Sequence, residues 1–140
     1  MKNYIEFSQI KAAIAEYEKL EELKQFEKVI AVTRGGLVVA GVLSQHLETR
    51  WYDAACVKSY RGADDQGELE IIRANPTEER VLLVEDVVDT GETIQSLKKI
   101  YPNSAVFALH VKKDKSKFIP DFYLWEAAAD EWLVYPWELE

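Results

Sequence analysis

The stretch that decides the fold is VLLVEDVVDTGET, residues 81–93. Its first four residues are all apolar, which is typical of a strand covered on both faces of a sheet, so we predict a central strand here. Glu85 and Asp86 follow directly, at the carboxyl end where open α/β sheets bind their ligands. Residues 89–93 then form a turn with one glycine and two threonines before a helix, whose first N–H groups favour phosphate.

An acidic turn of this kind also has a simpler explanation. Asp89 or Thr90 could cap the following helix while Glu85 and Asp86 are solvated, because acids and threonine are common at helix starts. The two carboxylates by themselves favour this structural explanation. Only the complete order of residues 81–93 favours a ligand site.

Outside this stretch, short β-branched runs alternate with longer helical patterns, which indicates an α/β domain. Strands are predicted at residues 29–32, 51–60, 69–72 and 105–111, and helices from Ser8 to about residue 24, at 37–47 and at 93–100. Gly35 and Gly36 break the first strand, and the polar residues 61–68 are predicted to form a mobile loop. The aromatic-rich tail from Asp114 is predicted to be irregular.

Composition limits the possible functions. The 140 residues have room for one compact domain, residues 1–140. The formal net charge of -8 argues against broad binding to nucleic acid or to an anionic membrane, so an anionic substrate would need local N–H groups, a few basic side chains or a metal ion. No apolar run is long enough to span a bilayer, and no signal peptide is recognisable. Cys56 is predicted to be a small core residue. A single cysteine fits a reducing compartment, so we expect the protein to be cytoplasmic.

The complete order of the opening stretch resembles a known motif. An apolar strand, Glu-Asp, two apolar residues and Asp-Thr-Gly-x-Thr is similar to the phosphoribosyl pyrophosphate motif of type I phosphoribosyltransferases. The likeness extends over about residues 29–137 and looks strongest to the bacterial xanthine-guanine enzymes, with features of the hypoxanthine-guanine enzymes. It implies an α/β fold of the type I class, with a mainly parallel central sheet flanked by helices and a small C-terminal hood, and it implies Mg²⁺ as the cofactor.

By this resemblance, the motif holds the sugar phosphate. Glu85 and Asp86 contact the ribose hydroxyls, directly or near the Mg²⁺, and are the expected metal ligands. Asp89 faces N7 of the purine as a proton acceptor or hydrogen-bond partner, and completes the expected catalytic set. The 5′-phosphate is wrapped by the loop made of Asp89, Thr90, Gly91, Glu92 and Thr93.

A second motif, TRGGL at residues 33–37, resembles the pyrophosphate loop of the family. Arg34 and Gly35 would contact the diphosphate, since glycine lets backbone amides approach oxygen atoms closely. Without the resemblance, two glycines after a strand more often form only a tight turn.

A third motif resembles the mobile segment that closes over the reaction centre in the hypoxanthine-guanine enzymes. It consists of Lys58, Ser59 and Tyr60, for which the structural alternative is an exposed strand end. A lid here would exclude water from the activated sugar. Enteric xanthine-guanine enzymes also use a loop arginine where this chain has Gly67, and Arg61 is the residue that could replace it.

The tail supplies the expected base pocket. Lys112 would direct its ammonium group at the purine 6-oxo oxygen, with Lys113 as the alternative, while Trp132 would stack on the ring and Leu133 would offer backbone groups. Glu138 resembles an acid that assists a second metal. Taken alone, Trp132 more often belongs to a core or an interface than to a ligand site, and Trp125 and Trp137 keep that assignment.

These likenesses predict a pentosyltransferase of purine salvage that moves 5-phosphoribosyl from phosphoribosyl pyrophosphate to N9 of guanine, xanthine or hypoxanthine. The expected partners are phosphoribosyl pyrophosphate, the purine base and further copies of the chain in a dimer or tetramer, with no nucleic acid. Three alternatives stay open: a transferase for adenine, orotate or uracil, a nucleotide-sensing regulator without useful turnover, and a non-catalytic α/β interaction domain. The sequence does not rank the 6-oxopurines, because Lys112 would contact an oxygen that all three share.

Overall fold

The computed structural model describes residues 2–49, 51–61 and 67–139, with the side chains of all of these except residues 59–61, 67 and 68. The elements in chain order are β1 (Lys2–Tyr4), α1 (Phe7–Ala15), the 3-10 helix η1 (Leu20–Gln25), β2 (Lys28–Thr33), α2 (Gly35–Ser44), β3 (Tyr52–Arg61), β4 (Gly67–Arg73), β5 (Val81–Val88), α3 (Glu92–Lys98), β6 (Ser104–Val111), β7 (Phe122–Glu126) and β8 (Trp132–Val134).

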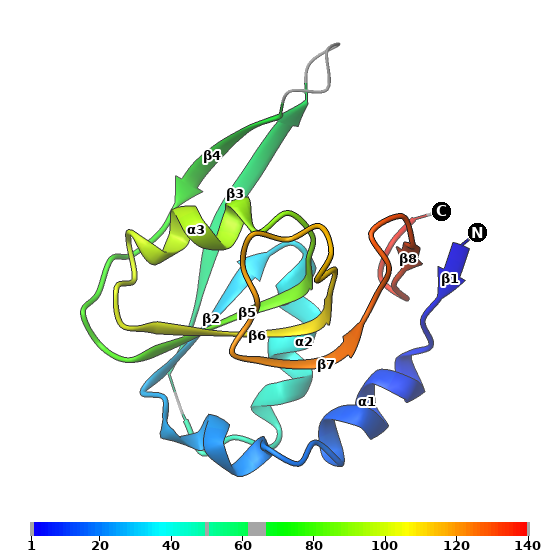
Figure 1. The fold of residues 1–140 in the computed structure, drawn as a ribbon. Coiled ribbons are helices and arrows are strands. Elements are labelled where there is room, and N and C mark those ends of the chain that lie inside the picture. The colour runs from blue at the N-terminus through cyan, green and yellow to red at the C-terminus, as the bar shows by residue number, and fades with distance from the viewer. Residues whose placement is uncertain (1, 50, 62–66, 140) are drawn as a thin grey trace.

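Six strands form the main sheet in the order β4-β3-β2-β5-β6-β7 (Figure 1). All neighbouring strands are parallel except β3 and β4, which form an antiparallel hairpin. β5 lies between β2 and β6, and its residues 81–84 are wholly buried, which confirms the predicted central strand. The α/β fold with a mainly parallel sheet flanked by helices is therefore confirmed.

The core consists of two hydrophobic clusters, one on each face of the sheet. Along β2, Val29 and Ala31 belong to the cluster that includes α1 and α2, whereas Ile30 and Val32 belong to the cluster that includes α3. This alternation follows from the two-residue period of a strand. Figure 1 shows the same division, with α3 on one side of the sheet and α1 and α2 on the other.

A second, two-stranded sheet joins the two ends of the described chain. β1 pairs in parallel with β8, and the register sets Lys2 opposite Trp132 and Tyr4 opposite Val134 (Figure 1). This small sheet forms the C-terminal hood, to which the N-terminal strand contributes. The prediction of an irregular tail was wrong, because the tail contains β7 and β8; its aromatic and β-branched residues are good strand formers.

Two helices differ from their predicted bounds. α1 begins at Phe7 because Glu6 and Gln9 form a capping box, and it ends at Ala15, well before the predicted residue 24. Beyond the end of α1, the Tyr17 ring packs edge-on against Phe107, with 5.8 Å between centroids, and residues 20–25 form the separate 3-10 helix η1. α2 begins at Gly35, two residues earlier than predicted, so both glycines of the TRGGL motif lie in its first turn.

Two more sequence predictions concern the acidic pair and the polar loop. β5 continues through Glu85 and Asp86 to Val88, so the prediction that these acids follow the strand was wrong; they lie inside its carboxyl-terminal half. Most of the predicted loop at residues 61–68 lies outside the described residues. In the ranges the structure describes, no helix is both long and apolar enough to cross a membrane.

Candidate active site

Glu85 and Asp86 occupy the part of β5 that has lost its neighbour β2. The pairing of β2 with β5 ends at Ala31 and Val84, so the two acids lie beyond it. Asp86 Oδ1 accepts a hydrogen bond from the backbone N–H of Val87 at 2.6 Å. Burial, together with the charge of Asp86, raises the pKa of Glu85 well above its usual value, and burial also raises the pKa of Asp86. A cation or hydroxyl donors at this pair would stabilise its ionised form.

The first turn of α2 fits against these acids only because it is made of glycine. A Cβ atom on Gly35 would lie 2.4 Å from the carboxyl group of Asp86, and one on Gly36 would lie 1.9 Å from the backbone oxygen of Val84. Both distances are far below van der Waals contact. The TRGGL motif thus brings Arg34, whose peptide bond with Thr33 is cis, next to the acidic pair.

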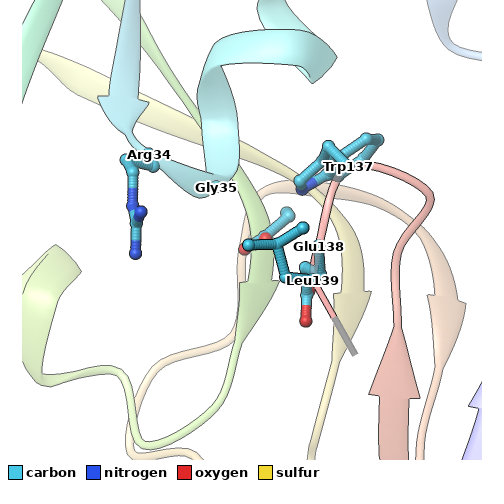
Figure 2. Close-up of a pocket in the computed structure, with 6 residues that line it drawn as sticks. Arg34, Gly35, Trp137, Glu138 and Leu139 are labelled. Atoms are coloured by element: carbon cyan, nitrogen blue, oxygen red, sulfur yellow. The ribbon is translucent and has the colours of Figure 1, made fainter.

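Figure 2 shows the cavity that results, with a volume of about 450 Å³. Arg34 and Gly35 line one side, and Trp137, Glu138 and Leu139 from the end of the chain line the other, with Asp86 also in the wall. Trp137 stacks on Tyr135 with 5.1 Å between ring centroids and 2° between planes. Trp137, which sequence reasoning assigned to the core, therefore packs partly against the core and also lines this cavity.

The acidic pair can contribute to a magnesium site but does not complete one. Carboxylate oxygen is the ligand that Mg²⁺ prefers, and Glu85 and Asp86 supply two such groups. Among the described side chains, no three histidine, cysteine or acidic residues cluster to hold a metal by themselves. The residues therefore fit a Mg²⁺ ion whose remaining ligands come from water and substrate phosphates, as is usual for this ion.

The turn after β5 forms a small cavity of about 80 Å³. It is lined by Glu85, Val87, Val88, Asp89, Thr90, Gly91, Thr93 and Ile94. Gly91 has a φ of 88°, which favours glycine, and a Cβ there would lie 2.9 Å from Ser116 Oγ and from Phe118 Cβ. Thr90 Oγ1 accepts the N–H of Glu92 at 3.3 Å, so the threonine also organises the turn itself.

A lysine that sequence reasoning did not single out contacts the first residue of this turn. Lys115 Nζ lies 2.8 Å from Asp89 Oδ1 as an ion pair. The lysine belongs to a loop after β6 that rests on the turn, since the Lys117 N–H donates to the Thr90 carbonyl at 2.9 Å. The signal was present in the run KKDKSK at residues 112–117, which places basic side chains beside the acidic motif once β5 and β6 are adjacent.

Asp89 also lines a third cavity, of about 310 Å³, together with the predicted base-binding residues. Lys112, Trp132 and Leu133 lie in its wall, whereas Lys113 turns away and pairs with Glu126 at 3.2 Å. Of the two alternatives, Lys112 is the lysine that lines the cavity. Trp132 is 58% exposed, with Lys2 Nζ 4.3 Å from its ring centroid, while Leu133 is buried.

The fourth cavity, of about 670 Å³, lies where the β3–β4 hairpin leaves the sheet (Figure 1). Its wall contains Arg34, Gly35, Lys58 and Thr93. Cys56 lines it too and is half-buried, so its assignment to the core was wrong. The reason is that β3 is exposed to this cavity where its hairpin extends past the sheet.

The predicted lid residues Ser59 and Tyr60, and Arg61 as the substitute for the loop arginine, are described only by their backbone atoms. Ser59 and Tyr60 belong to β3, and their side chains lie outside the described part of the structure. In the hairpin register Arg61 lies directly opposite Gly67, the position that the resemblance aligns with a loop arginine of the enteric xanthine-guanine enzymes. The substitute residue is thus at the same end of the hairpin as the residue it would replace.

We call the third cavity, lined by Asp89, Lys112, Trp132 and Leu133, the base cavity after the residues predicted to bind a base. Next to it lies a buried chain of hydrogen-bonded polar groups that sequence reasoning missed. His110 Nδ1 lies 2.9 Å from Tyr135 Oη, which donates to the backbone oxygen of Asp86 at 3.2 Å. Burial lowers the pKa of His110 to about 4, so the ring is neutral at physiological pH and donates from Nδ1. Nothing in the surrounding residues ALHV distinguishes this histidine from one that packs in a core.

These cavities adjoin the carboxyl-terminal half of β5 and the turn that follows it. Comparison with known proteins gives the family. The model of the phosphoribosyl transferase domain matches residues 4–139. The chain belongs to the phosphoribosyltransferase family. This confirms the resemblance that the motif at residues 81–93 indicated, and it makes phosphoribosyl transfer the general chemistry of the fold.

Solved structures with a similar fold include two phosphoribosyltransferases and one protein described as hypothetical. A purine phosphoribosyltransferase from Pyrococcus horikoshii Ot3 is 32% identical, with a TM-score of 0.81 over 99% of this chain and 95% of that one. A xanthine-guanine-hypoxanthine phosphoribosyltransferase from Helicobacter pylori is 21% identical, with a TM-score of 0.78 over 99% and 95%, and shares the fold. A hypothetical protein from Neisseria gonorrhoeae with bound ppGpp is 25% identical, with a TM-score of 0.75 over 99% and 91%.

Proposed function

We propose that this phosphoribosyltransferase acts in purine salvage and transfers 5-phosphoribosyl from phosphoribosyl pyrophosphate to N9 of a 6-oxopurine. The observation that carries the proposal is that Lys112 and Asp89 line the same cavity. They follow the adjacent parallel strands β6 and β5, and the Lys112 N–H donates to the Val88 carbonyl at 3.0 Å. A cation beside a carboxylate complements the O6 acceptor and the N7–H donor that a 6-oxopurine presents on one edge.

In the reaction, N9 of the base forms a bond to C1′ of the sugar while the bond from C1′ to the pyrophosphate oxygen breaks. Asp89 accepts the proton that the purine loses at N7. Its Oδ1 atom is already held by Lys115, so we assign the Oδ2 atom to the base. Lys112 stabilises the negative charge that shifts towards O6 as the proton leaves.

The sugar and its phosphates occupy the acidic half of the site. Glu85 and Asp86 would hold the ribose hydroxyls and a Mg²⁺ ion, and the ion would supply positive charge to neutralise the pyrophosphate. The turn at residues 89–93 holds the 5′-phosphate, and Arg34, Gly35 and Lys58 contact the diphosphate. Ser59, Tyr60 and Arg61 are assigned to the hairpin lid over it, with Arg61 in place of the arginine absent at Gly67. Glu138, which lines the same cavity, would assist a second metal ion.

The direct test is turnover. Purified protein with Mg²⁺ and phosphoribosyl pyrophosphate is expected to form nucleotide from guanine, hypoxanthine or xanthine. The change in purine absorbance measures this reaction. Adenine, orotate and uracil are measured in parallel as the bases of the rival transferases. The proposal is wrong if none of the three 6-oxopurines yields nucleotide, or if a rival base is used more efficiently.

A second candidate function is binding of a guanosine polyphosphate, favoured by the neisserial structure with bound ppGpp. A guanine nucleotide with phosphates on both the 3′ and 5′ sides would span the base cavity and the turn. Calorimetry with ppGpp tests this. Competitive inhibition of turnover would make ppGpp a regulator of the transferase, whereas binding without any turnover would make the chain a nucleotide sensor.

We also propose that the chain forms a homo-oligomer, a dimer or tetramer, in the cytoplasm. Support for the oligomer comes from α2, where Leu37 is 56% exposed and lines an apolar hollow of about 400 Å³ with Ala40, Gly41 and Tyr52. Exposed apolar surface of this kind is typical of subunit contacts. Sedimentation of the purified protein, compared with a Leu37→Lys variant, tests the proposal.

A further inference from the structure

The base cavity also contains groups that distinguish one 6-oxopurine from another. This inference rests on the proposed function, because it takes the base to lie with O6 and N7 towards Lys112 and Asp89. Those two residues stand at the carboxyl edge of the main sheet. The segment that leads into β8 of the hood contributes another part of the wall, at Ala129, Asp130 and Glu131. A purine held at O6 and N7 presents its C2 atom to that wall, because C2 lies on the far edge of the ring system.

Glu131 is held at this wall by the N-terminal strand. Its Oε2 atom accepts a hydrogen bond from Asn3 Nδ2 at 2.8 Å, and its Oε1 atom accepts one from the backbone N–H of Ala128 at 3.2 Å. The hydrogen bond from Asn3 is the main reason that the pKa of Glu131 is lowered, and the positive charge of Lys112 contributes. Glu131 is therefore ionised at neutral pH. Asp130, its exposed neighbour, lines the same cavity.

The charge of the cavity is consequently unbalanced. Its wall carries the carboxyl groups of Asp89, Asp130, Glu131 and Glu138 but one lysine, Lys112. Asp89 is paired with Lys115, and in the hood the ammonium group of Lys2 lies 4.3 Å from the Trp132 ring centroid. The two carboxyl groups of Asp130 and Glu131 outnumber this one cation, so the excess negative charge lies on the hood side.

The three 6-oxopurines differ in what they offer to that side. Guanine has an amino group at C2, which donates hydrogen bonds to carboxylates. Hypoxanthine has only hydrogen there. Xanthine has an oxygen acceptor, and it loses a ring proton near neutral pH, so that a large fraction of it is anionic. Like charges placed together are a common means of rejecting a ligand.

We propose that Asp130 and Glu131 make this site select guanine and reject xanthine, with hypoxanthine between them. Asn3 is a positioning residue, because it acts by fixing the carboxylate of Glu131. The hood thus sets the specificity at C2, which the lysine at O6 leaves open.

The test compares kcat/KM for guanine, hypoxanthine and xanthine between pH 6.5 and 8.5. We expect guanine to exceed xanthine by about tenfold or more at pH 8, the size of discrimination that single polar groups provide, and the difference to grow with pH as xanthine ionises. Hypoxanthine stays mainly neutral up to about pH 8, so over that part of the range it corrects for titration of the protein groups that face the base. In the Asp130→Asn/Glu131→Gln variant the ratio of guanine to xanthine is expected to fall by about tenfold.

Two controls separate charge at the cavity from other effects. Glu78→Gln removes one negative charge, as the single variant Asp130→Asn does, but at an exposed site before β5, at the opposite end of the strand from the acidic pair, and it leaves the ratio unchanged. The single variant Asp130→Asn changes an exposed side chain, so it reports on specificity even if Glu131→Gln disturbs the hood. Asn3→Ala is expected to lower the preference for guanine while the kcat for hypoxanthine stays close to the wild-type value.

Binding of the product nucleotides separates this inference from the proposed function. Calorimetry with GMP and XMP needs no turnover, and GMP is expected to bind at least about tenfold more tightly. If no base is converted but GMP is still preferred, the proposed reaction is wrong and the selectivity stands. If xanthine and XMP match guanine and GMP within about threefold, or the double variant leaves the ratio unchanged, the selectivity is wrong.

Discussion

The contact between α2 and β5 allows a prediction in which one methyl group has opposite effects at two positions of the same helix. Gly36→Ala would place a Cβ atom 1.9 Å from the backbone oxygen of Val84. Relief requires the two backbones to separate until that distance reaches at least 3.0 Å, a displacement of 1.1 Å or more. Gly41→Ala, one and a half turns further along α2, would place its Cβ where no atom lies within 4 Å.

The expected free energies follow from two terms. Alanine in place of glycine in a helix stabilises by about 0.5–1 kcal/mol, and this term applies to both variants. Forced overpacking against a buried backbone costs about 1–3 kcal/mol or more, and it applies only to Gly36→Ala. We therefore expect Gly41→Ala to raise the free energy of unfolding slightly and Gly36→Ala to lower it, with a difference between them of roughly 2 kcal/mol.

Urea denaturation followed by tryptophan fluorescence measures both variants. Because Val84 precedes Glu85 in β5, the same displacement moves the acidic pair, so Gly36→Ala should also lose transferase activity while Gly41→Ala keeps it. Equal stability of the two variants would show that the helix and the strand are not packed as described, and the argument for glycine at this position would fail.

Three further predictions concern charged groups of the site. Asp89→Asn is expected to lower kcat about 100-fold or more, measured by nucleotide formation, because the amide cannot accept the purine proton; unchanged kcat would remove Asp89 from the reaction. Lys115→Met is expected to lower kcat with little change in the urea midpoint, because the ion pair with Asp89 is partly exposed and contributes little stability; a large loss of stability would contradict this role. Burial lowers the pKa of His110 to about 4, so the folded protein loses stability as the pH falls from about 6.5 to about 4. Replacement of His110 by Asn is expected to reduce that loss by up to about 3 kcal/mol. Denaturation curves at successive pH values measure the difference. The pKa values of Glu85 and Asp86 are shifted upwards, which gives the opposite pH dependence, so the difference between variant and wild type is the quantity to measure; a parallel pH profile would rule out the role of His110.

Residues 81–93 were enough to predict the centre of the fold, because a strand buried on both faces leaves a continuous apolar run in the sequence. The same stretch gave the family, since the order of acids, glycine and threonine within it is specific. The bounds of β5 were less accessible. Glu85 and Asp86 are polar residues in a strand, and only the departure of β2 beyond Ala31 explains why they are tolerated there.

The parts that sequence did not predict depend on contacts between distant segments. β1 is three residues long and has no apolar pattern of its own, so its pairing with β8 leaves no local signal. The ion pair of Lys115 with Asp89 and the hydrogen bond of His110 with Tyr135 likewise join residues more than 20 positions apart. Periodicity describes one element at a time and carries no information about such pairs.

The pairing of β1 with β8 has a consequence for synthesis of the chain. Lys2 finds its partner Trp132 only after 130 further residues have been added. At translation rates of about 5–20 residues per second, β1 therefore waits roughly 6 to 26 seconds for β8. The main sheet around β5 can form during this delay, whereas the pairing of β1 with β8 cannot. A nascent chain of this protein would thus acquire the turn proposed to hold phosphate before the wall proposed to select the purine.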